Sequence, residues 1–475
     1  MAVEPSQSFS NTPRLESNHA VYPLSPMQQG LLFHALCAPN SDAYINQLSA
    51  RLDGPLNVDA FVKAWQLTID RYSILRTRFI WDDLRQPLQT FVENVVFSIN
   101  LVDWRALSTE HQAKQLVALM ETDRRQAFDL SHPPLMRATL IRLSEQTHRF
   151  LWTYHHLILD GWSLVLVLRH ISIFYESACR GETPTLKESR PYCDYINWLQ
   201  RQDTTTAEAF WRRAFSPAPR CVPVRSLLQP SEREQYETQQ IHLSSHLTAS
   251  LNRFARDHHL TMSTLLHAAW AILLGRYNQA DDVVFGTVVS GRPAELTGVD
   301  SIVGLFINTL PMRVALRLTD WLLPWLQDLQ LYAASVREHQ YTPLATVQAY
   351  ASCPGGHALF DSFVCFDNYS IDPSLRYELA DLRLSDIFEF GRSHYAVAFK
   401  AVPGRELSLT IIYDCARLYR TAVTGILNDL TALLTRITIQ PHVRLQALMV
   451  PAHGATEPDR RQAVLGVFNE PFALD

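Results

Sequence analysis

Seven consecutive residues, His155 to Gly161 (HHLILDG), bring together two imidazoles, a carboxylate and a glycine. Imidazole is the side chain best suited to move a proton near neutral pH, because its ordinary pKa of about 6.5 lies there. Glycine has no side chain, so a substrate can lie directly against the main chain at Gly161. The segment therefore predicts proton transfer to or from a group held close to the backbone.

The flanking residues predict a strand, a turn and a helix around this segment. Phe150, Trp152 and Tyr154 alternate with more polar neighbours as in a half-buried strand, and the His pair ends that run. The apolar stretch from Leu164 to Leu168 indicates the start of a buried helix. Side chains at such a turn point into clefts.

A buried Asp160 would be costly without a cation or hydrogen bonds. Arg292, in the segment SGRP that follows an apolar strand at Val283 to Val289, is the cation that we expect beside it. The sequence therefore predicts an Asp160–Arg292 ion pair that holds the turn across two halves of the molecule. In this interpretation Asp160 is structural more than catalytic.

Other interpretations of the turn stay open. His155 and His156 could be core residues at a strand end, with Asp160 capping the next helix. A metal site built from these three residues is disfavoured, because adjacent strand residues point to opposite faces. A covalent acyl-enzyme is also disfavoured, since no Ser or Cys stands in a G-x-S-x-G turn.

The composition is that of a soluble globular protein with two domains. The chain has 475 residues, 47% of them hydrophobic and 19% charged. Its net charge of -5, without a Lys/Arg cluster, argues against nucleic acid as a partner. Seven scattered Cys without a CxxC pair indicate free thiols in a reducing cytoplasm. No apolar run reaches the roughly 18 residues that span a membrane, so we expect no membrane partner.

Mixed strands and helices in both halves predict an α/β sandwich in each. We expect a linker or docking tail at 1–21, an N-terminal lobe at 22–205, a C-terminal lobe at 206–450 and a linker toward another domain at 451–475. The lobe boundary lies close to a Pro-rich break at 216–230. The apolar periodicities predict helices at 58–72, 247–255, 262–277 and 422–434 and strands at 283–289 and 407–413. Asn57 or Asp59 would cap the first helix.

Seven segments, in order, resemble the motifs of condensation domains of nonribosomal peptide synthetases. The core motif is HHLILDGWS, from His155 to Ser163. The other six are YPLSPMQQGLLFH (22–34), RYSILRTRF (71–79), YCDYINW (192–198), VGLFINTLPMR (303–313), HQYTPLATVQ (339–348) and the weaker HALFDSFVCF (357–366). The second motif departs from the family at Tyr72, where His is more usual. The resemblance covers about residues 22 to 450.

This resemblance implies two chloramphenicol-acetyltransferase-like α/β sandwich lobes arranged as a V-shaped pseudodimer. The active site would lie in a tunnel between the lobes, and an upstream and a downstream peptidyl carrier protein would dock at its two mouths. The domain itself would bind no cofactor, because both substrates arrive on the 4'-phosphopantetheine arms of the carriers. The acceptor α-amine would attack the donor thioester and form an amide.

By position in the motifs, His156 would be the catalytic residue. His155, Asp160, Gly161 and Arg292 would support it, with Asp160 and Arg292 in the places of the family's structural ion pair. Substrate-tunnel positions carried over from the motifs are Trp162, Ser163, Ser290, Asn308 and Thr309.

The motif variants resemble those of domains that take a donor ending in a D-residue and an L-aminoacyl acceptor. The last residues, VFNE at 467–470, resemble the approach to an adenylation domain, and we expect the excised domain to be monomeric. An epimerisation domain of the same superfamily, a non-catalytic docking platform for tailoring enzymes and an acyltransferase using free acyl-CoA remain as alternatives.

Overall fold

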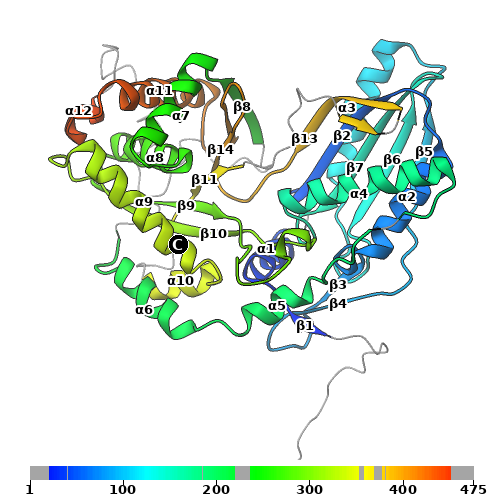
Figure 1. Cartoon of the computed structure of the whole chain (residues 1–475), viewed down its shortest axis with the longest axis horizontal. Coiled ribbons are helices and arrows are strands. Elements are labelled where there is room, and N and C mark those ends of the chain that lie inside the picture. Colours follow the sequence, from blue (N-terminus) through cyan, green and yellow to red (C-terminus); the bar gives the residue numbers. More distant parts are fainter. Residues whose placement is uncertain are drawn as a thin grey trace, which may run out of the picture.

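Two six-stranded sheets and a small three-stranded sheet form the framework of the protein. In Figure 1 the two large sheets, each with its helices, form the two arms of a V, and α1 (Pro26–Cys37) and α5 (Cys193–Leu199) lie near its base. The computed structural model describes residues 21–39, 41–184, 186–219, 236–351, 358–367, 377–379 and 381–450. Residues 1–20 of the expected tail at 1–21, the expected linker at 451–475, His357 and most of the Pro-rich break lie outside these residues.

The N-terminal arm holds the strand that carries the His pair. Its sheet has the order β12-β13-β2-β7-β6-β5. These strands are Tyr377–Leu379, Leu382–Phe390, Ile45–Asp53, Thr147–His155, Met136–Arg142 and Ile99–Asp103. The helices α2 (Val58–Arg71) and α4 (Gly161–Arg180) pack on each other and share one apolar core with the sheet. Helix α3 (Thr109–Arg124) contacts β2 and β7.

Strand β7 is buried on both faces, so the predicted half-buried strand is wrong in this respect. Phe150, Trp152 and Tyr154 face the apolar core as expected. The intervening, more polar residues are also buried, because their side chains bond to neighbours instead of water. Thr153, for example, donates to Asp123 of α3 and accepts a hydrogen bond from Gln47 of β2.

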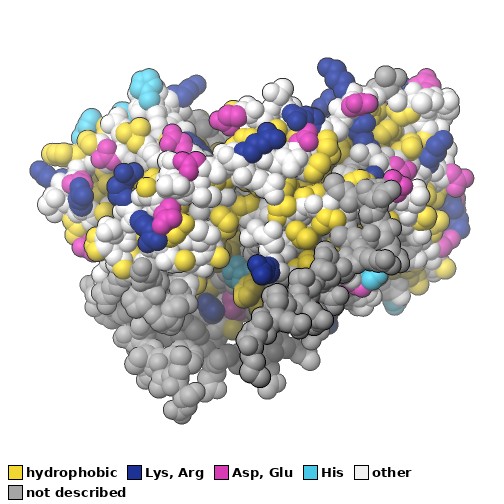
Figure 2. Space-filling view, turned by 90° about the horizontal axis from the view of Figure 1, so that it is seen from below, with side chains coloured by type: hydrophobic (Ala, Val, Ile, Leu, Met, Phe, Trp, Pro, Cys, Tyr) yellow, Lys and Arg dark blue, Asp and Glu magenta, His cyan; other side chains and the backbone are white. Residues whose placement is uncertain are grey.

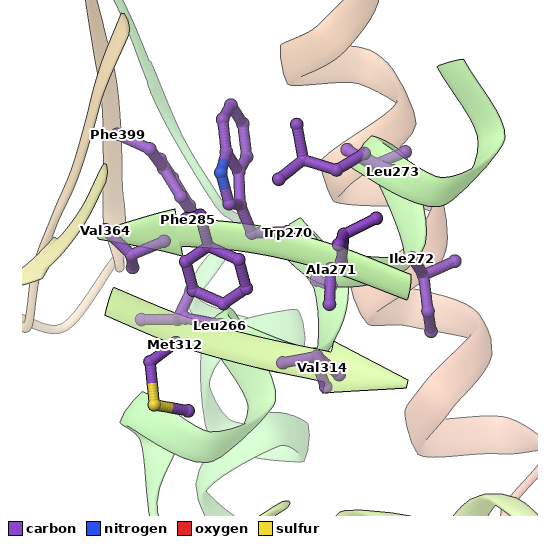
Figure 3. Close-up of a cluster of buried hydrophobic side chains, with 14 of the residues drawn as sticks. Leu266, Trp270, Ala271, Ile272, Leu273, Phe285, Met312, Val314, Val364 and Phe399 are labelled. Carbon is purple, nitrogen blue, oxygen red and sulfur yellow. The ribbon is translucent and has the colours of Figure 1, made fainter. Parts of the chain in front are cut away.

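The C-terminal arm has a second sheet of order β10-β9-β11-β14-β15-β8. Its strands are Asn308–Ala315, Asp282–Val289, Ser362–Phe366, Val397–Val402, Ser408–Asp414 and Tyr236–His242. Its helices are α6 (Thr204–Ala214), α7 (Ser245–Asp257), α8 (Met262–Asn278), α9 (Leu322–Glu338), α10 (Leu344–Ala351), α11 (Arg420–Ile439) and α12 (Leu445–Met449). Helix α8 is the centre of this core, where Trp270 stacks on Phe399 (Figure 3).

The helix and strand positions predicted from apolar periodicity are confirmed. Helix α2 spans Val58–Arg71 and is capped by Asn57, whose side chain accepts from the backbone N–H of Ala60. Helices α7 and α8 and strands β9 and β15 match their predicted ranges to within a few residues. Helix α11 runs five residues beyond the predicted end because the apolar stripe continues to the buried Ile437.

Helix α11 also has the length and composition of a membrane span, unlike any other helix of the described residues. Its apolar face is nevertheless part of the protein core: Val423, Leu430 and Leu434 are fully buried. Asp429, on the same helix, accepts a hydrogen bond from Tyr277 of α8. We therefore interpret α11 as a core helix.

The C-terminal half of the chain contributes two strands, β12 and β13, to the sheet of the N-terminal arm. Strand β13 follows β11 and precedes β14 in the chain, yet it pairs antiparallel with β2 of the N-terminal arm. The crossover at 391–396 then returns the chain to β14. The predicted lobe boundary at 205/206 stays a prediction. Strands β12 and β13 follow this boundary in the chain but belong to the sheet of the N-terminal arm. The small sheet, β1-β4-β3 (Tyr22–Pro23, Leu88–Phe91 and Thr77–Ile80), lies near the base of the V.

Candidate active site

The His pair lies on a turn between β7 and α4. Strand β7 ends at His155, and α4 begins at Gly161. Asp160 is the N-cap of α4, because its Oδ1 accepts the backbone N–H of Ser163 at 2.8 Å. The strand-turn-helix arrangement predicted from the sequence is confirmed.

The ring of His156 has one nitrogen committed and the other available. Its Nδ1 lies 2.6 Å from the carbonyl oxygen of Leu159. A carbonyl oxygen only accepts, so Nδ1 carries the proton, and Nε2 of the neutral ring carries the electron pair. Burial lowers the pKa of His156, opposed by the bond to Leu159 and the charge of Asp160. The ring is partly exposed, and Nε2 of the neutral imidazole can accept a proton.

His155 has the opposite arrangement. Its ring is buried, and its Nδ1 accepts the backbone N–H of Leu157 at 3.1 Å. Burial, together with the neighbouring His156, lowers its pKa to about 3. Since Nδ1 of each ring is bound to its own stretch of backbone, the two imidazoles do not converge on a common ion. Within the part of the chain that the structure describes, no group of three metal-binding side chains is found.

Asp160 and Arg292 form the ion pair that the sequence predicts. Arg292 Nη2 lies 3.3 Å from Asp160 Oδ1, and the two side chains are only 6% and 1% exposed. The backbone N–H of Phe306 donates to Oδ2 of the same carboxylate at 3.0 Å. Arg292 also donates to the carbonyls of Val299 and Ile302 and lies 3.9 Å from the centre of the Phe306 ring. The pair thus ties the turn to the C-terminal segment 292–306.

Ser163 completes this connection between the arms. Its hydroxyl donates to the carbonyl of Gly304 at 2.7 Å and accepts hydrogen bonds from Arg292 and from the backbone N–H of Gly304. Gly291 makes the approach possible, because its φ is +65° and an added Cβ would lie 1.7 Å from the carbonyl oxygen of Phe306. Gly304 is needed for the same reason, since its Cβ would overlap the ring of Tyr192 at 2.1 Å.

The two tyrosines of the motif YCDYINW bind the backbone of the same segment, 292–306. The Tyr192 hydroxyl donates to the carbonyl of Leu305, and the Tyr195 hydroxyl donates to the carbonyl of Phe306 at 3.4 Å. Both rings pack against the ring of Phe306. The motif therefore positions the backbone that binds Asp160.

Two supporting residues were not predicted. The buried amide of Gln28, in the opening motif, donates to the carbonyl of Leu157 at 3.1 Å. Tyr44 accepts the backbone N–H of His156 at 2.8 Å through its carbonyl oxygen. The spacing Ser25-x-x-Gln28 is a capping-box signature that could have located the start of α1. Nothing in the local sequence indicates Tyr44.

The tunnel residues carried over from the motifs differ in their surroundings. Ser163, Asn308 and Thr309 are buried. The Asn308 amide donates to the carbonyls of Gln340 and Thr342, and so fixes the HQYTPL segment. Ser290 is exposed, and Trp162 is partly exposed, with its indole N–H bound to the carbonyl of Asp300. Their place in a tunnel stays a prediction.

A second carboxylate lies close to Gly161. A Cβ on Gly161 would be 4.0 Å from Oδ2 of Asp367, which follows β11 of the C-terminal arm. Lys400 Nζ lies 3.1 Å from the same oxygen. The turn is therefore faced by charged groups of the other arm. Figure 2, which looks at the molecule from below, shows a hollow near the middle of this face, with His and charged side chains set among hydrophobic ones.

The fold and the site define a two-armed α/β protein with a partly exposed imidazole where the arms meet. Solved structures share this fold. The starter condensation domain of rhizomide synthetase superposes on this chain with a TM-score of 0.76 at 19% identity, and the superposition covers 90% of this chain and 97% of that one. The X-domain from teicoplanin biosynthesis gives 0.75 at 22% identity, covering 89% and 96%. The condensation domain profile matches residues 18–457, so the chain belongs to the condensation domain family.

Curated relatives agree with this assignment. A linear gramicidin synthase polypeptide from Brevibacillus parabrevis is 40% identical over 449 residues, which are 94% of this chain and 6% of that protein. Surfactin synthase subunit 3 from Bacillus subtilis (strain 168) is 33% identical over 401 residues, 83% of this chain and 31% of that protein. The chain thus spans less than a third of the length of these relatives.

Proposed function

We propose that this domain forms an amide bond between two substrates carried on phosphopantetheine arms. The donor is an aminoacyl or peptidyl thioester, and the acceptor is the α-amine of an aminoacyl thioester. The observation that carries the proposal is the state of His156: a neutral, partly exposed ring whose Nδ1 is bound to Leu159, leaving Nε2 as a base.

The proposed step balances in atoms and charge. The acceptor nitrogen attacks the donor carbonyl carbon, a C–N bond forms, and the carbonyl π pair moves to oxygen. His156 Nε2 takes the proton that the nitrogen loses. Collapse of the tetrahedral intermediate breaks the C–S bond, and the proton passes from the imidazolium to the departing thiolate. The Leu159 carbonyl and the Asp160 carboxylate both favour the imidazolium that forms in between.

The proton transfer during attack matters more than deprotonation beforehand. A free α-amine has a pKa of about 7.7 to 8.0, so freeing its electron pair at pH 7 costs only about 1 kcal/mol. A positioned base contributes about 10²- to 10⁴-fold. Holding the two arms end to end supplies much of the remainder through proximity.

The decisive experiment loads donor and acceptor arms on two carrier proteins and follows transfer by intact-mass spectrometry. His156→Ala should lower peptide formation by about 10²- to 10⁴-fold while carrier binding is retained. His258→Ala, which alters a His in the connection between α7 and α8, is the matched control and should keep full turnover. Unchanged turnover in His156→Ala would remove this residue from the mechanism.

We further propose a donor that ends in a D-residue and an L-aminoacyl acceptor, supported by the variants PLSPMQQG, LDGW and HQYTPL. A D-aminoacyl donor should be transferred faster than its L-epimer from the same carrier. Equal rates would contradict this assignment. Hydrogen exchange at the donor α-carbon without transfer would indicate epimerisation instead.

The proposed partners follow from the same activity. They are an upstream and a downstream peptidyl carrier protein and an adjacent adenylation domain, within a multidomain synthetase of the cytoplasm. The relatives, which are much longer than this chain, support this setting.

A further inference from the structure

The backbone of His156 is held by a residue of unusual conformation. The N–H of His156 donates to the carbonyl oxygen of Tyr44 at 2.8 Å. Tyr44 precedes β2 and has a φ of 68°, in the left-handed region that residues with a side chain rarely adopt. Such a conformation persists only where the surroundings hold it, and it is frequent at functional sites.

The contacts that hold Tyr44 come from the crossover between β13 and β14. Its N–H donates to the carbonyl oxygen of Arg392 at 2.9 Å, and its buried hydroxyl is bound to Nδ1 of His394. The Arg392 guanidinium reaches back to the carboxylate of Asp42 and to Ser41. The crossover therefore holds Tyr44 and the residues just before it.

His394 is itself packed against two aromatic rings. Its ring lies 3.6 Å, centre to centre, from the ring of His34 on α1 and 4.0 Å from that of Tyr395. Burial, with the nearby His34 and Arg417, lowers the pKa of His394 to about 3. The ring is therefore neutral at pH 7, and its Nδ1 can accept the hydrogen bond of the Tyr44 hydroxyl.

We propose that Tyr44 and His394 are positioning residues for the catalytic imidazole. Through the chain His394, Tyr44 and the backbone of His156, the crossover sets where Nε2 points. The inference rests on the role proposed above for His156. It adds a dependence of the reaction on a segment 350 positions from Tyr44 in sequence.

The first test compares Tyr44→Phe with Tyr413→Phe. Both changes remove a tyrosine hydroxyl whose ring is buried, but the Tyr413 hydroxyl donates to Glu237 at 2.8 Å, within the C-terminal sheet. Tyr44→Phe should lower kcat about tenfold, because small misplacements of reacting groups are costly, and leave the KM for both carriers unchanged. Tyr413→Phe should change neither. Equal kcat values in the two variants would overturn the inference.

The second test asks whether the His394 bond acts through Tyr44. His394→Asn keeps a hydrogen-bonding group near the place of Nδ1 and should retain most of the activity, whereas His394→Leu should match Tyr44→Phe. The double variant Tyr44→Phe/His394→Leu should be no slower than either single variant, since both break one bond. Fully multiplicative losses would contradict the coupling.

A spectroscopic readout separates failure of this inference from failure of the proposed function. The ¹⁵N shifts of the His156 ring, assigned by their loss in His156→Gln, tell a protonated Nδ1 from a protonated Nε2. They should show Nδ1–H in the wild type and a mixture of tautomers in Tyr44→Phe. A wild type that makes no peptide but shows this change would sink the function and keep the positioning role. An unchanged tautomer in Tyr44→Phe would overturn the positioning role whatever the turnover.

Discussion

The turn that carries His156 is held from two sides by different kinds of interaction. On one side Asp160 is bound to Arg292, Ser163 and the backbone of Phe306, all around one buried charge pair. On the other side His156 is bound to Tyr44 and Tyr44 to His394, both through neutral groups, while the Arg392–Asp42 ion pair holds the residues before Tyr44. Both sides draw their contacts from the C-terminal arm.

This difference separates stability from positioning. A buried charge that loses its partner is far more costly than a neutral hydrogen bond that is lost. The Asp160 side should therefore determine whether the two arms stay together at the turn. The Tyr44 side should determine where the imidazole points in a protein that remains folded.

The largest expected effect is that of Asp160→Ala. The change leaves Arg292 buried without its countercharge, and it also removes the acceptor for the N–H groups of Ser163 and Phe306. We expect the free energy of unfolding to fall by about 3 to 5 kcal/mol, measured by urea denaturation. Tyr44→Phe should cost only about 1 kcal/mol in the same assay.

Lys114→Ala is the control for charge as such. Lys114 pairs with Glu110 on the surface of α3, where the side chains are 72% and 75% exposed. Its loss should change stability by less than about 1 kcal/mol. If Asp160→Ala were as mild as Lys114→Ala, the proposed contrast between the two sides would be lost.

Gly291→Ala tests the backbone that brings Arg292 to the turn. An added Cβ would lie 1.7 Å from the carbonyl oxygen of Phe306, so the segment must move away from Asp160. Gly181→Ala is the matched control, because its φ of +67° is nearly the same but nothing lies within 4 Å of the added Cβ. Gly181→Ala should cost about 1 to 2 kcal/mol from strain alone, and Gly291→Ala clearly more. Similar urea midpoints for both variants would show that the clash is relieved locally.

The sequence predicts the Asp160 side far better than the Tyr44 side. A carboxylate in an apolar run requires a partner, so the physical cost of burial points to Arg292 even though it lies 132 positions away. A neutral hydrogen bond such as that between Tyr44 and His394 gives no such signal in the sequence. Tyr and His occur both at the surface and in the core, so their presence does not indicate a partner. Such a bond can be found only once the crossover has been placed.

Local patterns were sufficient for the elements and insufficient for their partners. Apolar periodicity predicts α2 and α8 because each buries one face or its whole surface in a core. The same reasoning misjudged β7, since alternation implies a wet face, whereas Thr153 and its neighbours are covered through polar bonds to α3 and β2. The pairing of β13 with β2 is likewise a tertiary event that no local period encodes.

The Tyr44 side should be sensitive to acid. Burial, His34 and Arg417 lower the pKa of His394 to about 3, whereas an unfolded His has a pKa of about 6.5. Between these values the unfolded chain binds more protons, so the free energy of unfolding rises with pH and falls on acidification below about pH 6.5. Removing the imidazole in His394→Asn should reduce this slope by up to about 1.4 kcal/mol per pH unit.

Urea midpoints measured between pH 4 and 7 check this expectation. Tyr44→Phe is the control, because it breaks the bond but keeps the buried imidazole, and it should retain most of the slope. The buried His155, with a pKa lowered to about 3, maintains a slope of the same sign in every variant. An unchanged slope in His394→Asn would mean that the His394 ring binds protons equally in the folded and the unfolded chain.

The smallest expected effect is that of Trp162→Phe. Trp162 lies on the Asp160 side, and its indole N–H donates to the carbonyl oxygen of Asp300 at 2.9 Å, at a partly exposed position. The Arg292 guanidinium lies 5.6 Å from the ring centre, and Phe keeps an aromatic face there. Because water can replace the lost donor, we expect a loss of only about 0.5 to 1 kcal/mol in the urea assay. A loss as large as that of Asp160→Ala would show that the strength of this side comes from its neutral contacts as much as from its buried charge pair.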